Sequence, residues 1–305
     1  MNTQLLKYAV EVERTGSISR AAENLYMNQP NLSKAIRDLE ENMGITIFKR
    51  ASKGITPTPK GKVFLQYAKN VLQQIENMES LYLPTNSGVI QFDIVVPRAS
   101  YIAYACTELV KTLDLTKALQ INYHETNSID AVKSVADYTH SLGIIRYQTI
   151  HEPFFNSLTE ENNLIARPVM AFEYLVLMSK IHPLANEDRL NYTQLGEYIE
   201  ITHGDLSLPL SFAKAQGSPQ ESKKEIAVYE RGSQFELLCR IPSTYMWVSS
   251  IPEDMLNRFE LVQKKCDIPN NMYKDVLIYR SDYRPSPIDE AFFAILNQVV
   301  QSVQA

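Results

Sequence analysis

The segment NQPNLSKAIR, residues 28 to 37, gathers amide, hydroxyl and basic side chains within ten positions. Such groups hydrogen-bond the edges of bases or hold phosphates in nucleic acid complexes. Leu32, Ala35, Ile36 and Leu39 recur at steps of three and four, which predicts a helix with one buried face. With one residue from the preceding segment, the candidates for contact with DNA are Ser19, Asn28, Gln29, Pro30, Asn31, Ser33, Lys34 and Arg37.

Two shorter helices are expected to hold this segment in place. Apolar residues from Leu5 to Val12 predict a first helix, which Thr15 and Gly16 bring to an end. Ser19 is expected to cap a second helix that ends near Tyr26. Its small residues would allow another helix to come close.

The third helix has clear signals at both ends. Asn28 is a good cap, Pro30 suits the first turn, and Gly44 supplies a natural stop. Two helices joined by a turn of three or four residues, the second polar and basic, are typical of a helix-turn-helix that inserts into the major groove of DNA. A helical hairpin that binds nothing is the alternative.

The next stretch, IFKRASKGITPTPKGK, predicts a short basic hairpin or wing. Arg50 and Lys53 would lie against phosphates or the neighbouring minor groove. Pro57 and Pro59 argue against a paired central strand, because proline cannot donate to a ladder.

A long helix is expected after Thr58-Pro59, and it could form a dimer seam. Apolar residues alternate there at steps of four and three, as in a heptad repeat, although packing into the chain's own core would give the same pattern. Two helix-turn-helix units related by a twofold axis would double the phosphate contacts and impose a fixed spacing between the two DNA half-sites. The predicted seam residues are Phe64, Ala68, Val71, Ile75 and Met78.

Charge and composition set limits on the class of protein. Residues 1–83 hold 11 Lys and Arg against 8 Asp and Glu, while the remaining 222 residues hold 19 against 27. The basic excess therefore lies in the segment with the helix-turn-helix pattern. Glu11, Glu13 and Arg14 stand where a signal peptide would need an apolar run, so the chain is expected to be cytoplasmic, without a membrane partner.

The sequence gives little support for an enzyme. It has no GxSxG, GxxxxGK[ST], HExxH or GxGxxG motif, and its five histidines lack metal-ligand spacing. We expect no catalytic residues, metal or cofactor. Cys106, Cys239 and Cys266 are far apart, so inert thiols are favoured over a redox pair, which is kept as an alternative.

Across about sixty residues the chain resembles the LysR-type transcriptional regulators. The matching residues and motifs are Gly16-Ser17-Ile18-Ser19, Ala21-Ala22, Leu25, Asn28-Gln29-Pro30-Asn31-Leu32-Ser33, Ile36, Leu39-Glu40, Gly44, Phe48-Lys49-Arg50 and Thr58-Pro59-Lys60-Gly61. Two positions depart from the family pattern. Asn28 replaces the usual serine and keeps its capping capacity, and Pro57 replaces the usual leucine.

From Gly88 onward, β-like and helix-like segments alternate, which predicts parallel sheets with helices on both faces. The resemblance implies an α+β multidomain chain: a winged helix-turn-helix, a linker helix, and an α/β effector-binding domain of two subdomains resembling type 2 periplasmic binding proteins. The expected divisions are residues 1–58, 59–88 and 89–305, with subdomain I at 89–163 and 267–305 and subdomain II at 164–266.

A small-molecule effector would bind between those subdomains, where strand ends and helix starts converge. Hydroxyls, amides and free N–H groups there suit a small anion, typically a carboxylate, although each residue could be an ordinary cap or turn residue. The candidates are Arg98, Ser100, Tyr101, Asn127, Ser128, Arg146, Thr202 and His203.

The function that follows is a homodimeric or homotetrameric, effector-modulated regulator of transcription that binds double-stranded promoter DNA, with RNA polymerase as a possible partner. A cysteine-based redox sensor and a constitutive regulator with a vestigial cleft are the alternatives. The sequence names neither the effector nor the target genes.

Overall fold

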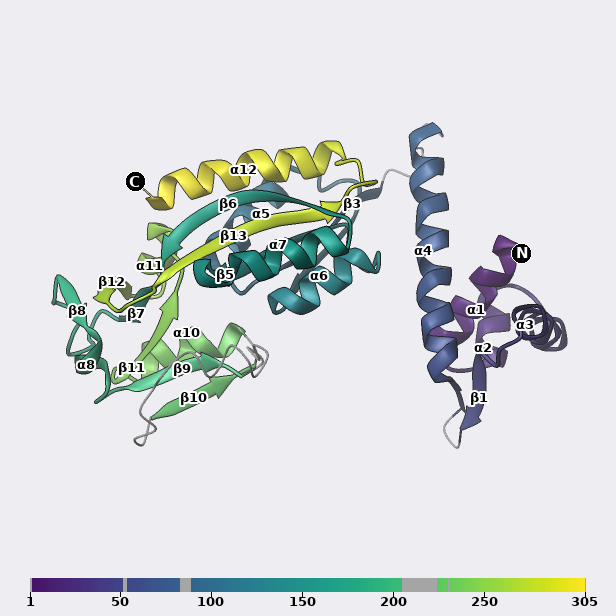
Figure 1. Ribbon diagram of the computed structural model, residues 1–305, viewed down its shortest axis with the longest axis horizontal. Coiled ribbons are helices and arrows are strands. Elements are labelled where there is room, and N and C mark those ends of the chain that lie inside the picture. Colours follow the sequence, from purple (N-terminus) through teal and green to yellow (C-terminus); the bar gives the residue numbers. More distant parts are fainter. Residues whose placement is uncertain (1, 52–53, 83–88, 205–223, 230, 305) are drawn as a thin grey trace. The chain divides into compact units, whose positions relative to one another are not determined.

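The structure is a computed structural model, and the residues that it describes are 2–51, 54–82, 89–204, 224–229 and 231–304. The chain divides into two compact units, residues 1–88 with 137–139, and residues 89–136 with 140–305. Each unit is shown in ribbon form in Figure 1. Among the described residues, no helix combines the length and apolar character that a membrane crossing requires.

The first unit consists of helices and one small hairpin. Its elements are α1 (Thr3–Thr15), α2 (Ile18–Asn24), α3 (Gln29–Met43), β1 (Phe48–Ala51), β2 (Gly54–Pro57) and α4 (Pro59–Tyr82). Strands β1 and β2 pair antiparallel. The predicted helices, the wing and the linker helix are therefore all present, in the predicted order.

Local capping explains where these helices begin and end. The side chain of Asn28 accepts a hydrogen bond from the amide of Asn31, at 3.0 Å, and Gly16 and Gly44 end α1 and α3 in the left-handed conformation. The prediction that Ser19 caps α2 is wrong. Ser17 is the cap, since its backbone is extended and its hydroxyl accepts from the amide of Arg20, whereas Ser19 lies within the first turn.

The core of the first unit is formed by one face of each helix. Leu6, Ala9 and Val12 of α1 pack with Leu32 and its neighbours on α3, and residues of α4 complete the cluster. The wing and α4 cross at close range, because a Cβ atom on Gly61 would lie 2.0 Å from the carbonyl oxygen of Ile47. Only glycine fits at this crossing.

The predicted seam on α4 needs a correction. Phe64 and Ala68 are 9% and 2% exposed and belong to the core of their own unit, so they have no surface left for a second chain. The neighbouring Leu65 is fully buried in the same cluster. Val71 is exposed and Ile75 is half-buried, and the side chain of Met78 lies outside the part that the structure describes. Intrachain core packing is therefore what produces the first part of the heptad pattern.

The second unit contains a five-stranded and a six-stranded sheet. The five-stranded sheet has the order β4-β3-β5-β13-β6. Its strands are β3 (Val89–Val96), β4 (Ala118–Glu125), β5 (Leu142–Gln148), β6 (Leu164–Glu173) and β13 (Met272–Arg280). Strand β3 runs parallel to β4 and β5, whereas β13 runs antiparallel to both β5 and β6.

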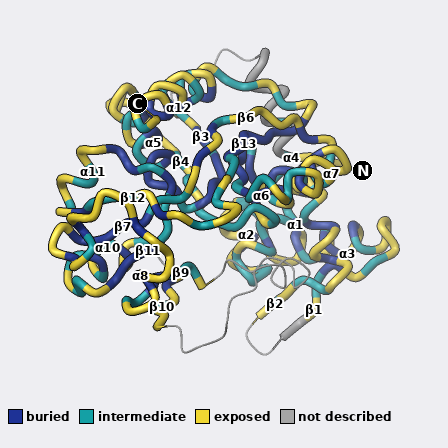
Figure 2. The backbone as a smooth tube through the Cα atoms, turned by 60° about the vertical axis from the view of Figure 1, so that its left-hand side comes forward, coloured by how far each residue is buried: buried dark blue, intermediate teal, exposed yellow. Residues whose placement is uncertain are grey.

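Helices cover both faces of this sheet. One hydrophobic cluster joins the sheet to α5 (Ser100–Thr112) and α12 (Pro287–Gln304), and another joins it to α6 (Ser128–Ala136) and α7 (Glu152–Glu161). A 3-10 turn, η1 (Thr149–His151), precedes α7. Figure 1 shows α12 lying along β6 and β13. In Figure 2 the outer turns of α12 are exposed, while much of β3 is buried, as expected for a strand covered on both faces.

The six-stranded sheet has the order β10-β9-β11-β7-β12-β8. Its strands are β7 (Leu175–Ser179), β8 (Arg189–Asn191), β9 (Ile199–His203), β10 (Glu225–Val228), β11 (Thr244–Val248) and β12 (Leu261–Asp267). Its helices are α8 (Tyr192–Leu195), α10 (Arg231–Arg240) and α11 (Glu253–Arg258).

Two predictions about this unit were wrong in part. The sheets are mixed rather than parallel, because the chain passes from one sheet to the other twice and returns in the opposite direction on β13. The boundary expected at residue 164 comes too early, since β6 belongs to the five-stranded sheet up to Glu173. Pro168 is tolerated there because β6 is an edge strand with a register shift beside it.

Gly61→Ala should destabilise the first unit by about 2 kcal/mol, because the new methyl group meets a backbone carbonyl that cannot move freely. Urea unfolding of the full chain measures the effect. The control is Gly232→Ala in α10, where a Cβ atom meets nothing within 4 Å and alanine favours the helix. Equal stability of the Gly61 variant and the wild type would contradict the proposed close packing.

Candidate functional site: a DNA-reading helix and a cleft between two sheets

The N-terminal end of α3 presents a polar surface. Gln29, Asn31, Lys34 and Arg37 are exposed, and Ser33 is half-buried, while the opposite face of the helix is in the core. Asn28 uses its side chain as the cap, so it positions the helix start. Free backbone N–H groups at a helix start also favour contact with phosphates.

The wing is fastened to α3 by one carboxylate. Glu40 accepts hydrogen bonds from the backbone amides of Ile47 and Phe48, at 2.6 and 2.9 Å. This contact places β1 beside the C-terminal half of α3. Of the predicted wing residues, Lys53 and the side chain of Arg50 lie outside the described residues.

The second unit contains a cleft of about 630 Å³ where its two sheets meet. This volume is within the range of small-molecule sites. Five of the predicted effector residues line it: Arg98, Ser100, Arg146, Thr202 and His203. The other liners include aromatic side chains from both sheets and from the connections between them, namely Tyr174, Tyr192, Trp247 and Tyr273.

Three of the predicted effector residues do not face the cleft. Tyr101 is fully buried, and its hydroxyl donates a hydrogen bond to Asp275. Burial raises the pKa of that phenol well above its usual value. Asn127 caps α6 by accepting from the amide of Asp130, at 2.9 Å. Ser128 fastens α6 to β5, because its hydroxyl exchanges hydrogen bonds with the backbone of Arg146.

A buried ion pair forms one wall of the cleft. Arg146 donates from Nε and Nη2 to the two carboxylate oxygens of Asp275, at 2.7 and 2.6 Å, and Nη2 also reaches Ser249 at 3.2 Å. The guanidinium lies 4.7 Å from the ring centre of Phe172. Burial opposes its charge, but the carboxylate of Asp275 outweighs that cost and the pKa of Arg146 is raised above its ordinary value.

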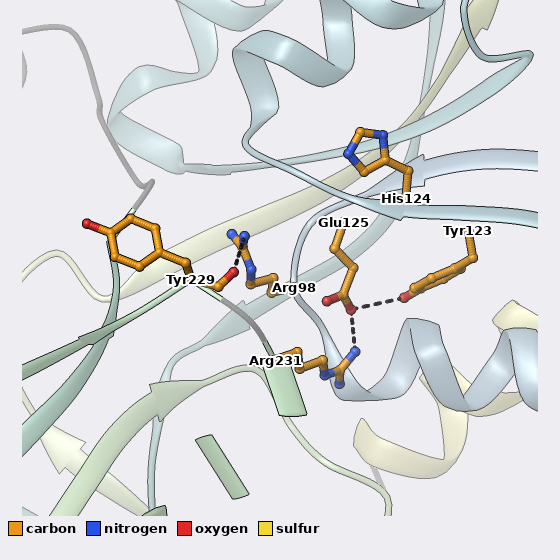
Figure 3. A pocket seen from close by; sticks show the side chains of 6 residues that line it. All are labelled: Arg98, Tyr123, His124, Glu125, Tyr229 and Arg231. Atoms are coloured by element: carbon orange, nitrogen blue, oxygen red, sulfur yellow. Dashed lines mark hydrogen bonds and ion pairs between the residues drawn. The ribbon is translucent and has the colours of Figure 1, made fainter. Parts of the chain in front are cut away.

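A second ion pair crosses from one sheet to the other (Figure 3). Arg231, at the start of α10, pairs with Glu125 at the end of β4 at 2.5 Å and donates to the hydroxyl of Ser100 at 2.8 Å. In the opposite direction, Arg98 donates to the carbonyl of Tyr229 at 3.2 Å. A second hollow of about 550 Å³ is lined by Arg98, Glu125, Tyr229 and Arg231, and both arginines line the main cleft as well.

The two connections between the sheets are held together by one side chain. Asn271, between β12 and β13, accepts from the amide of Tyr174 at 3.1 Å and donates to its carbonyl at 2.8 Å. Tyr174 joins β6 to β7, and its ring lies 4.2 Å from that of Tyr273. The two connections between the sheets are therefore tied to each other beside the cleft.

Several of these residues were not among the sequence predictions. Asp275, Glu125 and Arg231 gain their importance from partners more than 100 positions away, a distance at which sequence spacing gives no signal. Gln234 and Trp247 likewise enter the cleft only through the folding of α10 and β11. A buried carboxylate within the apolar run of β13, at Asp275, is the one local signal that was available.

The three cysteines are free, and two of them, Cys106 and Cys266, are buried. Burial raises the pKa of each thiol, and for Cys266 the nearby charge of Asp267 contributes to a value of about 11. The thiol of Cys239 donates to the carbonyl of Phe259 at 3.1 Å. Thiols in such surroundings are mostly protonated near neutral pH and react slowly.

Comparison with known proteins decides the family. The model of the bacterial regulatory helix-turn-helix protein, lysR family, matches residues 3–62. The HTH-type transcriptional activator AllS of Klebsiella pneumoniae is 28% identical over 239 residues, covering 75% of this chain and 82% of that protein. The chain belongs to the LysR family. It is a DNA-binding regulator of transcription, like the curated proteins it matches.

Other members of the family support this assignment in sequence and in fold. The regulator CysB of Haemophilus influenzae is 28% identical over 209 residues, 67% of this chain and 61% of CysB. A full-length OxyR variant from Pseudomonas aeruginosa has a TM-score of 0.62 at 15% identity, covering 99% of this chain and 95% of that one. CbnR, crystallised with its target DNA, has a TM-score of 0.60 at 14% identity, with 98% and 100% covered. At these identities the structures show the shared fold.

Asp275→Asn should destabilise this LysR-family protein by about 3 kcal/mol, because it leaves the buried charge of Arg146 without its counterion. Chemical unfolding of the full chain measures the loss. The matched control is Asp267→Asn, whose partner Arg189 is 62% exposed, so the loss should be much smaller. Similar losses for both variants would show that burial does not set the importance of the pair.

Proposed function

We propose that the chain binds partly palindromic promoter DNA as a dimer or a dimer of dimers, through α3, and that a small-molecule effector in the cleft changes the assembled geometry. One observation carries the DNA-binding part: the start of α3 is polar, capped and exposed, while its other face is buried. Gln29, Asn31, Ser33 and Lys34 would face base edges, and Arg37 and the wing would face phosphates.

Gln29→Ala should weaken binding to a preferred genomic site by about 1–3 kcal/mol and leave binding to scrambled DNA almost unchanged, because the amide would contact base edges. Fluorescence anisotropy with both duplexes at one salt concentration measures this difference.

The control is Asn42→Ala, at the opposite end of α3, where the side chain is also exposed. This variant should bind both duplexes as the wild type does. If Gln29→Ala and Asn42→Ala behave alike on the preferred site, the leading end of α3 does not read the sequence.

A dimer is supported by an apolar stripe on α4 that differs from the predicted seam. Val63, Tyr67 and Val71 are four positions apart, so they share one face of the helix, and they are 55%, 67% and 41% exposed. Exposed apolar side chains in a row on one helix favour burial against a second helix. Of the seam residues predicted from sequence, Val71 and Ile75 stay in the proposal.

Val71→Asp should shift the protein toward the monomer, because a charge would be buried in the proposed seam. Sedimentation velocity at micromolar concentration measures the mass. Lys62→Asp, at an exposed site on the same helix, is the control and should leave the mass unchanged. An unchanged mass for Val71→Asp would exclude this stripe from the dimer interface.

Effector control is supported by the cleft and by the two connections beneath it. A ligand that contacts both sheets can favour one arrangement of them, and a difference of about 1–3 kcal/mol is enough to regulate. The anion expected from sequence is one ligand class for this cleft. Contact with RNA polymerase is a further part of the proposal that the family function suggests.

A redox sensor is the second candidate, since OxyR proteins are among the solved structures of similar fold. The raised pKa values of Cys106, Cys239 and Cys266 argue against it, because a thiolate is the form that oxidants attack. A constitutive regulator with a vestigial cleft is a third reading. We favour control by a small-molecule effector, because the cleft has the size of a ligand site and polar groups from both sheets.

A further inference from the structure

One buried polar group in the cleft lacks a partner. Gln234 of α10 is 4% exposed and lines the cleft, and its Oε1 accepts no hydrogen bond from any described residue. A buried acceptor without a donor destabilises the folded chain, because it has lost its hydrogen bond to water without gaining another. A ligand that brings an N–H or O–H group to this oxygen would remove that cost.

The cationic groups of the cleft are already engaged. A guanidinium has five N–H donors. For Arg146, Nε and Nη2 donate to Asp275, Nη2 donates also to Ser249, and Nη1 is 3.5 Å from the hydroxyl of Tyr174. With its charge neutralised by Asp275, this arginine offers little to an incoming anion.

Ser100, which was predicted to bind an anion at the start of α5, already has a partner. The hydroxyl of Ser100 accepts from Arg231, and the charge of Arg231 is in turn balanced by Glu125. The cleft also contains a buried carboxylate, Glu200, which is 7% exposed and accepts a hydrogen bond from the hydroxyl of Tyr245 at 3.2 Å. Arg146 and Arg231 therefore use several of their donors within the chain and offer little to a free carboxylate ligand.

Flat side chains line the remaining surface. The ring centres of Tyr174, between β6 and β7, and Tyr273, at the start of β13, lie 4.2 Å apart, and Trp247 lies on β11 of the other sheet. Ile150, Met246 and Val248 add apolar surface. Such walls suit a planar ring, because aromatic faces stack favourably and exclude water.

We infer that the cleft binds an uncharged planar ligand with an N–H donor, such as an aromatic or heterocyclic amide, whose N–H reaches Oε1 of Gln234 while its ring packs against the aromatic walls. This inference rests on the proposed function and names the ligand class for the same site. A carboxylate of the same ring is the competing class.

The single tryptophan of the chain, Trp247, reports on the cleft directly. Its fluorescence is recorded while full-length protein is titrated with two matched pairs, nicotinamide against nicotinate and benzamide against benzoate. The amide of each pair should change the emission at a concentration at least about tenfold lower than the carboxylate, because the carboxylate has no N–H donor for Oε1 of Gln234.

The variant Gln234→Met keeps the size of the side chain but removes the acceptor, and it should weaken amide binding about tenfold. Gln298→Met, on the exposed side of α12, is the control and should bind as the wild type does. A thermal unfolding midpoint no lower than that of the wild type identifies variants that fold normally, because loss of the unpaired acceptor of Gln234 should not destabilise the chain.

Carboxylates that bind as tightly as the amides, or the absence of binding by either amide, would overturn the inference. The comparison within each pair uses the wild-type protein, so it does not depend on the folding of any variant. Binding of genomic DNA without added ligand tests the proposed regulator separately. If DNA binding and a carboxylate response are both found, the ligand class is wrong while the proposed function stands.

Discussion

The first unit depends on how α3 divides its surface. Leu32, Ile36 and Leu39 must be buried for α3 to dock on α1 and α2, and the same geometry leaves the polar residues at its start exposed. The cap at Asn28 fixes where the helix begins, and Glu40 fixes where the wing follows. The spacing that buries the apolar face of α3 therefore also exposes its polar face.

The second unit depends on charges that are satisfied within the chain. Arg146 and Asp275 join adjacent strands, whereas Arg231 and Glu125 join the two sheets beside the cleft. The first pair is buried and stiffens one wall. The second pair lies in the hollow beside the cleft and joins the two sheets. A ligand that changes the distance between the sheets would therefore strain or break this pair. These pairs engage Arg146 and Arg231 within the chain, whereas Oε1 of Gln234 accepts no hydrogen bond from any described residue.

Local signals in the sequence predicted most of the first unit. Capping and helix ends depend on a few adjacent residues, so Asn28 and Gly44 were identified correctly. Ser19 was misassigned because Ser17 and Ser19 have the same chemistry, and only the backbone conformation distinguishes a cap from a first-turn residue. The heptad pattern of α4 was ambiguous because Phe64 and Ala68 satisfy it by packing within their own unit.

The second unit was less predictable because its arrangement is set by contacts between distant segments. Alternating strands and helices predicted the fold class, but the antiparallel return of β13 depends on two passages between sheets that have no local signature. The family resemblance indicated a cleft, and five of the eight proposed residues line it. Tyr101, Asn127 and Ser128 were chosen by position in sequence, and their side chains serve the packing and capping of the helices.

The central claim is that the start of α3 lies in the major groove of promoter DNA. Methylation interference on a genomic fragment selected by the purified protein tests it most directly, because methyl groups on guanine N7 obstruct that groove. The account predicts interference at guanines clustered in two half-sites, separated by one helical turn or a multiple of it. Binding that tolerates methylation at every guanine N7, or a protein that selects no fragment over scrambled competitor, would contradict it.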